Sequence, residues 1–139
     1  MVMPPIKFRH GEVFSAVFSA QADVSLNSAE IVFRQGERAD SALYLISGRV
    51  SIGIRLDDGR VVTVAVRGPG ELIGEMALVT GIRCSEVQSI DPVLALRVSY
   101  ALITQLVNCR PDFALAMHSL ATARLYEANA MLASALAGD

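Results

Sequence analysis

The fold of this chain is decided by residues 50–66, which read VSIGIRLDDGRVVTVAV. From Val50 to Leu56, apolar side chains alternate with small or polar ones, and this period of two predicts a strand with one buried face. Asp57-Asp58-Gly59 is a turn signal, and residues 61–66 return as the partner strand. The stretch therefore predicts a β-hairpin.

Short apolar runs continue on both sides of this hairpin. Residues 31–33 and 42–46 come before it, each followed by a glycine turn, and residues 84–89 and 93–98 come after it. Eight of the ten glycines lie between Gly36 and Gly81. Short strands at this spacing predict a mainly β fold over about residues 20–98, either a β-sandwich or a jelly-roll (double-stranded β-helix) barrel.

Beyond Ser99 the pattern becomes helical and is expected to stay so over about residues 99–136. Residues 100–108 predict one short helix. Pro111 suits the first position of a second helix, and Asp112 is favourable near its positive end. This second helix is rich in alanine and has no interior glycine or proline, so its intrinsic propensity is high up to about Leu136.

The second helix is expected to carry an apolar stripe, one turn of which covers the barrel, and to use its distal end for association. The alanine-rich end is too apolar to stand alone in water, so we expect it to pack on the same helix of a second copy. Folding back within the chain is the alternative. The expected stripe consists of Phe113, Met117, Leu120 and Leu125, continued by Met131, Leu132 and Leu136.

Composition points to one domain over residues 1–139. The 53% apolar content is enough to bury a core, and the net charge is −2. The arginines are scattered singly, and the chain ends soon after the long helix, so direct DNA binding is not expected. The N-terminal residues lack the apolar run typical of a signal peptide, and no uncharged run is long enough to span a membrane, so we expect a cytoplasmic protein.

Neither a metal site nor an active site is expected. His10 and His118 are isolated from any acidic cluster, and Cys84 and Cys109 are too far apart in sequence for metal-like or redox-like spacing. No nucleophile–base pair is readable, so we do not expect an enzyme.

The candidate site is a binding site formed by residues 74–78 (GEMAL) and 83–85 (RCS). Gly74 has no Cβ and lets backbone approach a ligand closely. If residues 75–78 form a helical turn, their free N–H groups point at that ligand. Arg83 supplies a forked donor set for phosphate oxygens, and Glu75 can accept from hydroxyls. An anion that carries a sugar diol would satisfy all three features.

These stretches resemble the cyclic-nucleotide-binding domain of catabolite-activator-type regulators, protein-kinase regulatory subunits and cyclic-nucleotide-gated channels. The resemblance covers about residues 26–126 and rests on residues 33–37 (FRQGE), 42–50 (ALYLISGRV) and 68–70 (GPG) leading into 74–78. The first two blocks are similar to those that build the family's β-roll. The third block, together with Arg83, is similar to its phosphate-binding cassette.

The resemblance implies a cyclic-nucleotide sensor, with cAMP more expected than cGMP, no metal, and a final helix that closes over the ligand and reports its presence. It implies that Glu75 accepts the ribose 2′-hydroxyl and that Arg83 pairs with the cyclic phosphate. The other implied contacts are the backbone N–H groups of Gly74, Met76 and Ala77, the donors of Cys84 and Ser85 at the phosphate, Val64 and Ile73 against the purine, and Arg124 as a lid.

Two features depart from the family pattern. The loop from Gly81 to Arg83 looks one residue shorter, and Glu86 stands where a neutral threonine is frequent. Glu86 would either face the phosphate and repel it, face solvent, or pair with a neighbouring arginine. These departures favour an alternative, a degenerate β-roll that dimerises and no longer binds cyclic nucleotide.

Overall fold

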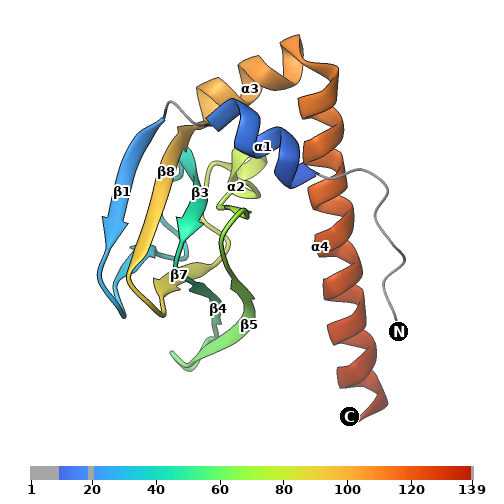
Figure 1. The fold of residues 1–139 in the computed structure, drawn as a ribbon. Helices are drawn as coiled ribbons and strands as arrows, with labels where there is room; N and C mark the ends of the chain where they lie inside the picture. The colour runs from blue at the N-terminus through green and yellow to red at the C-terminus, as the bar shows by residue number, and fades with distance from the viewer. Residues whose placement is uncertain (1–9, 19–20, 139) are drawn as a thin grey trace.

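The computed structural model describes residues 10–18 and 21–138 (Figure 1). Within them, eight strands build two sheets, and four helices lie before, between and after the strands. In chain order the elements are α1 (His10–Phe18), β1 (Ala22–Leu26), β2 (Ile31–Phe33), β3 (Ser41–Ser47), β4 (Val50–Arg55), β5 (Val61–Arg67), β6 (Leu72–Ile73), α2 (Ala77–Thr80), β7 (Glu86–Ser89), β8 (Val93–Ser99), α3 (Tyr100–Cys109) and α4 (Pro111–Ala137).

The two sheets are antiparallel and four-stranded, in the orders β1-β8-β3-β6 and β2-β7-β4-β5. Apolar side chains from both sheets form one core cluster, which includes Leu43, Leu45, Val50, Ile73 and Val87. The predicted fold class, a β-roll followed by C-terminal helices, is confirmed.

The predicted hairpin is β4 and β5, paired from Val50 with Arg67 to Arg55 with Val61. A bulge interrupts it. Ile52 pairs with Ala65 while Gly53 pairs with Thr63, so β5 has one residue more than β4 at this point. A bulge shifts the inward and outward alternation of a strand. The simple period of two therefore does not hold along the whole of β5.

The predicted helices match closely, whereas three short elements went unpredicted. Helix α3 begins directly after Ser99, whose side chain accepts a hydrogen bond from the Leu102 N–H at 3.1 Å and caps the first turn. Strand β7 begins at residue 86 rather than 84. The unpredicted elements are α1, β1 and β6, which have nine, five and two residues and carry little periodicity of their own.

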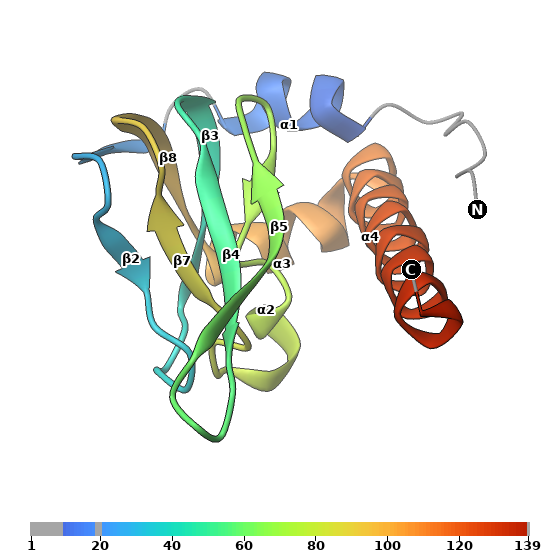
Figure 2. The same ribbon diagram turned by 90° about the horizontal axis from the view of Figure 1, so that it is seen from below.

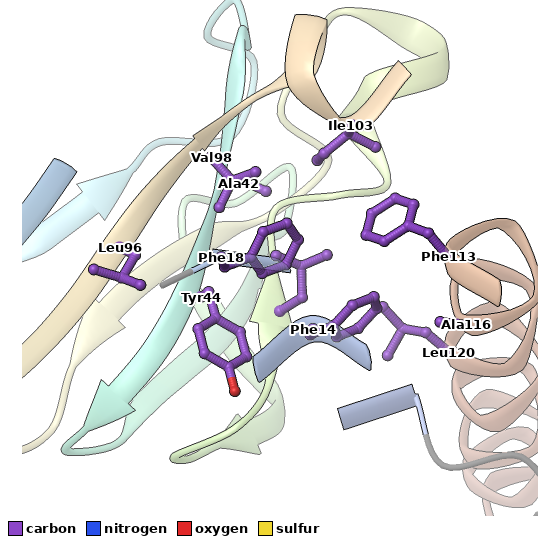
Figure 3. Packing of buried hydrophobic residues seen from close by; sticks show 11 residues of the cluster. Phe14, Phe18, Ala42, Tyr44, Leu96, Val98, Ile103, Phe113, Ala116 and Leu120 are labelled. Carbon is purple, nitrogen blue, oxygen red and sulfur yellow. The ribbon is translucent and has the colours of Figure 1, made fainter. Parts of the chain in front are cut away.

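A second core cluster joins the helices to the outside of the first sheet (Figure 3). Phe14 and Phe18 of α1 each lie 5.8 Å, ring centroid to centroid, from Phe113 of α4. All three rings are fully buried. Aromatic pairs at this separation add to the stabilisation from buried area. The first half of α4 is thereby fixed against α1 and the β-roll.

The predicted apolar stripe of α4 is wrong at Leu125. Phe113 and Leu120 are buried, but Leu125 is 60% exposed. Five residues carry the helix about 140° beyond a whole turn, so Leu125 lies on a different face from Leu120. Figures 1 and 2 show that the C-terminal half of α4 runs past the β-roll with no other labelled helix beside it. Among the described helices, none is both long and apolar enough to cross a membrane.

Candidate ligand-binding site

A cavity that is partly open to solvent lies where β-roll residues and α4 face each other. Nine of the ten predicted site residues line it. They are Ile73, Gly74, Glu75, Met76, Ala77, Arg83, Cys84, Ser85 and Arg124, and the lining also includes Phe33, Ile52, Arg67 and Val87, which sequence reasoning did not select.

Gly74 occupies a position that only glycine fits. Its φ of +81° lies in the left-handed region, and a Cβ there would come within 2.7 Å of the Phe33 ring and 2.8 Å of Arg83 Nη1. Both contacts are far closer than real Cβ atoms allow. The predicted need for glycine therefore has two physical causes, the backbone conformation and the packed neighbours.

We define the cassette as residues 74–85. Its helical turn begins later than predicted. Helix α2 covers residues 77–80 rather than 75–78, although the Leu78 N–H already donates to the Glu75 carbonyl at 3.1 Å. The helix ends at Gly81, whose φ is +76°. Within this turn Ala77 is buried and Met76 is 64% exposed.

Glu75 joins the cassette to α4. Its Oε1 pairs with Arg124 Nη1, and Arg124 Nη2 donates to the Leu72 carbonyl. The two side chains are only 10% and 15% exposed. The second carboxylate oxygen, Oε2, is buried without a hydrogen-bond partner, and it is the one such side-chain atom among the described residues. Buried acceptors are almost always satisfied, so Oε2 marks a place where a donor is missing.

Arg67 makes a second connection between the roll and α4. Its guanidinium donates to both Glu127 carboxylate oxygens, at 3.2 and 2.7 Å, and lies 3.7 Å from Glu71. Burial opposes its charged form, but the hydrogen bonds and charge of Glu127 raise the pKa of Arg67 above its ordinary value. Nothing in the sequence distinguished Arg67 from the other scattered arginines, because its partner Glu127 is 60 residues away.

Arg83 lines the cavity but directs its donors into the protein. Arg83 is only 6% exposed. Its Nη2 donates to the Ser41 carbonyl at 2.7 Å. Its Nη1 donates to the Gly74 carbonyl and to Tyr100 Oη, each at 3.2 Å. Its Cζ lies 3.4 Å from the Phe33 ring centroid, a cation–π contact. Desolvation lowers the pKa of Arg83 from its ordinary value. Both terminal nitrogens of the guanidinium thus already have protein acceptors.

The residues that follow Arg83 divide between the cavity and the sheet. Cys84 is exposed and Ser85 is half-buried, and both line the cavity. Glu86 is buried and lies outside the lining, and its Oε1 accepts from Arg55 Nη2 at 2.9 Å. Glu86 was expected to face the phosphate, to face solvent or to pair with an arginine. The structure shows the third alternative, an ion pair with Arg55.

Val64 is the one predicted site residue that does not line the cavity. It is the extra residue of the bulge in β5, without a register partner in β4. The bulge changes which side chains of the strand face inward and which face outward. Arg67 of β5 and Ile52 of β4 line the cavity, and Val64 does not. In the described ranges, no group of three or more His, Cys, Asp or Glu side chains is arranged to hold a metal ion.

Comparison with known proteins identifies the family. Residues 23–108 match the model of the cyclic nucleotide-binding domain, and the chain therefore belongs to that family. The matched residues span the strands of both sheets, the cassette between β6 and β7, and most of α3. Helix α4 follows the matched residues.

Curated relatives and solved structures agree with this assignment. The chain is 30% identical over 109 residues to a CRP-like cAMP-activated global transcriptional regulator of Mycobacterium tuberculosis, covering 78% of this chain and 49% of the relative. It is similar to the Thermus thermophilus catabolite activator protein (TM-score 0.76, 26% identity, 87% of this chain and 57% of that one). The c-di-GMP-responsive regulator CLP of Xanthomonas campestris shares the fold (TM-score 0.78, 24% identity, 88% and 63% covered). The chain spans about half the length of the curated relatives it matches.

Proposed function

We propose that this chain binds a cyclic nucleotide, cAMP in preference to cGMP, in the cavity between the cassette and α4, and that it acts as a sensing domain and not as an enzyme. Family membership supports the ligand class. The relative from Mycobacterium tuberculosis, which is described as cAMP-activated, supports cAMP. The observation that carries the proposal is the unpartnered Oε2 of Glu75 beside the cavity.

The sugar is the part of the ligand that Glu75 recognises. Oε1 is already engaged by Arg124, whereas Oε2 has no hydrogen-bond partner, so Oε2 is the oxygen that we expect to accept from a ribose 2′-hydroxyl. A hydroxyl supplies the donor that this oxygen lacks, and a charge-assisted bond to it is stronger than a neutral one. The left-handed bend at Gly74 brings backbone close to the same ligand.

The phosphate is assigned to Arg83 together with Cys84 and Ser85. Ser41, Gly74 and Tyr100 take three of the five N–H donors of Arg83, so a phosphate oxygen can accept from a remaining N–H or be exchanged for one of these three acceptors. A phosphate is a stronger acceptor than a carbonyl or a phenol, which favours that exchange. The purine is assigned to Ile73 and the apolar lining around it, with Arg124 as part of the lid.

Helix α4 is the element that we expect to report ligand occupancy. Glu75 would hold the sugar through one oxygen and Arg124 of α4 through the other. Ligand binding can shift the position of α4 only if the ligand binds one arrangement more tightly than the other. The shared carboxylate is the physical link through which that difference would reach the helix.

A homodimer through α4 completes the proposal. Leu125, Leu132 and Leu136 expose 60%, 59% and 80% of their surface and recur at helical spacing along the distal half of the helix. We call these three residues the outer stripe. Apolar residues spaced by seven and four positions are typical of a helix that packs against another helix.

The test is calorimetric titration of the protein with cAMP, cGMP and 2′-deoxy-cAMP, together with the variant Glu75→Gln. We expect cAMP to bind more tightly than cGMP, and Glu75→Gln to weaken cAMP binding by about 1–3 kcal/mol. The variant should also lose most of its preference for cAMP over the 2′-deoxy analogue. Glu12→Gln, an exposed change on α1, is the matched control and should leave binding as it is.

Two results would contradict the proposal. If calorimetry detects no binding of either cAMP or cGMP, the alternative is favoured, a degenerate β-roll that keeps the fold and the exposed helix and no longer binds cyclic nucleotide. Strong discrimination against 2′-deoxy-cAMP by Glu75→Gln would remove Glu75 from the sugar contact while leaving ligand binding itself intact.

A further inference from the structure

We propose that Cys84 is a modification site at the opening of the ligand cavity. Formation of a mixed disulfide between its Sγ and a low-molecular-weight thiol blocks the cyclic nucleotide, and bound nucleotide in turn shields the thiol. The inference rests on the proposed function, because it assumes that the cavity holds a cyclic nucleotide. It adds an inhibitory covalent control to that same site.

Cys84 meets the geometric requirements for this chemistry. It is exposed, so a disulfide in solution can reach its sulfur, and it also lines the cavity, so an attached group stays beside the ligand. Thiol exposure is one of the conditions that make a cysteine reactive. Arg83, the preceding residue, is assigned to the phosphate, so an adduct on Cys84 would compete for the space of the phosphate end of the ligand.

The backbone around Cys84 is held in place. The Arg83 N–H donates to the Glu37 carbonyl at 2.8 Å, and the Gly36 N–H donates to the Arg83 carbonyl at 2.9 Å. On the other side, Glu86 is buried and paired with Arg55. Because both flanks are anchored, an adduct on Cys84 cannot be carried away from the cavity by a simple movement of the loop.

A second and independent observation indicates that this cavity takes a ligand. Glu75, whose side chain is nine-tenths buried, lines the same cavity and has one carboxylate oxygen without a hydrogen-bond partner. The thiol and the unsatisfied acceptor therefore belong to one binding space. A group large enough to fill the opening at Cys84 would obstruct the path of a ligand to Glu75.

The chain contains its own control thiol. Cys109 is also exposed, but it is the last residue of α3 and does not line the cavity. The same disulfide can react with both cysteines. An adduct on Cys109 tests the effect of modification alone, whereas an adduct on Cys84 tests modification at the cavity.

The reaction is thiol–disulfide exchange with a low-molecular-weight disulfide, here oxidised glutathione. The Cys84 thiol loses its proton, and the thiolate attacks one sulfur of the disulfide. A new S–S bond joins Cys84 to one glutathione while the original S–S bond breaks. The second glutathione leaves as a thiolate and takes up the proton, so the exchange consumes no further oxidant. A reductant such as dithiothreitol reverses the modification.

The experiment uses Cys109→Ser, which leaves Cys84 as the single thiol, before and after treatment with oxidised glutathione. The adduct is verified by mass spectrometry, and cAMP binding is measured by calorimetry. We expect the adduct to weaken binding by at least about tenfold and dithiothreitol to restore it. In the matched variant Cys84→Ser, which retains Cys109, the same treatment should not change whatever affinity that variant has.

A second readout follows the modification rate of each thiol in the unaltered chain. Saturating cAMP should slow the labelling of Cys84 and leave that of Cys109 as it was. Equal cAMP affinity of the modified and unmodified Cys109→Ser protein would overturn this inference alone. Absence of cAMP binding in the untreated protein would overturn the proposed function, and this inference with it.

Discussion

Helix α4 consists of two regions that are similar in composition and opposite in environment. Its inner face, which we define as Phe113, Ala116, Leu120 and Ala123, is buried against α1 and the β-roll. The outer stripe is exposed along the distal half. Both are apolar and both lie on one continuous helix. An apolar face of this helix is therefore buried only where another element, here α1 or the β-roll, packs against it, whatever its residue types.

Two ion pairs lie where these regions meet. Arg124 pairs with Glu75 of the cassette, and Glu127 pairs with Arg67 of β5. Because residues 124 and 127 are three apart, both face the same side of the helix. The inner face is therefore held by apolar packing, and the next turn of α4 is held by charge. Substitutions in each part of the helix should therefore differ in what they change.

Replacement of Phe113 by alanine should have the largest effect on stability. The ring is fully buried against Phe14 and Phe18, so its loss removes apolar contacts and leaves a cavity. We expect the free energy of unfolding to fall by about 3–5 kcal/mol, measured by urea denaturation. Leu115→Ala, on an exposed part of the same helix, should change it by no more than about 0.5 kcal/mol. Similar losses in the two variants would remove the distinction between the faces.

Breaking the pair between Arg124 and Glu75 should have an intermediate effect. Arg124→Ala leaves a largely buried carboxylate without its cation, and we expect a loss of about 1–3 kcal/mol in the free energy of unfolding. Arg124→Ala combined with Glu75→Gln should lose less than the sum of the single changes, because the uncompensated charge is gone. Arg49→Ala, which breaks an exposed pair with Asp91, is the control and should lose at most about 1 kcal/mol. Additive losses would show that the buried pair does not couple the cassette to α4.

A charge in the outer stripe should act on association and not on the fold. Leu132→Glu places a carboxylate on the exposed distal half, so the free energy of unfolding of a single copy should change little. Dimer affinity, measured by analytical ultracentrifugation, should fall by at least about tenfold. Equal sedimentation behaviour at all concentrations in the variant and the parent protein would contradict the proposed dimer.

The smallest effect should be a dependence of stability on pH through His10, which touches the inner part of α4. Its Nδ1 lies 3.2 Å from Ser119 Oγ. Burial lowers the pKa of His10 below its ordinary value of 6.5, the charge of Arg124 lowers it further, and Glu71 opposes the shift. Below pH 6.5 the unfolded chain therefore takes up the proton first, and stability falls as the pH falls until the folded pKa is passed. His10→Gln should reduce the loss of stability as the pH falls below 6.5, and an unchanged slope would exclude His10.

Much of the fold was predictable because its signals are local. The hairpin of β4 and β5, the glycine turns, and the start of α4 at Pro111 each depend on a few neighbouring residues. Helix α1 could not be predicted in the same way. Its nine residues are stabilised mainly by the contact of Phe14 and Phe18 with Phe113, about 100 residues further along the chain. Tertiary packing of this kind leaves no periodic signal.

The candidate site shows the same limit. Residues 74–78 and 83–85 were recognisable because a glycine, an acid and an arginine lie close together in the sequence, and the structure brings all of them except Leu78 to one cavity. Arg67 and Phe33 were missed because their roles depend on distant partners, Glu127 and Arg83. Val64 was misplaced because a bulge in one strand cannot be read from an alternation that continues on both sides of it.

Most strands of the β-roll, the two C-terminal helices and the glycine bend of the cassette could be predicted from the order of the residues. Each of these follows from turn chemistry, side-chain periodicity or the absence of a Cβ, which act over a few residues. Three features became visible in the folded chain alone: Arg83 donates inward to Ser41, Arg124 pairs with Glu75, and one face of α4 is buried while the other is exposed. The physical reason is that hydrogen bonds, ion pairs and burial depend on distances across the folded chain, and the order of the residues does not contain those distances.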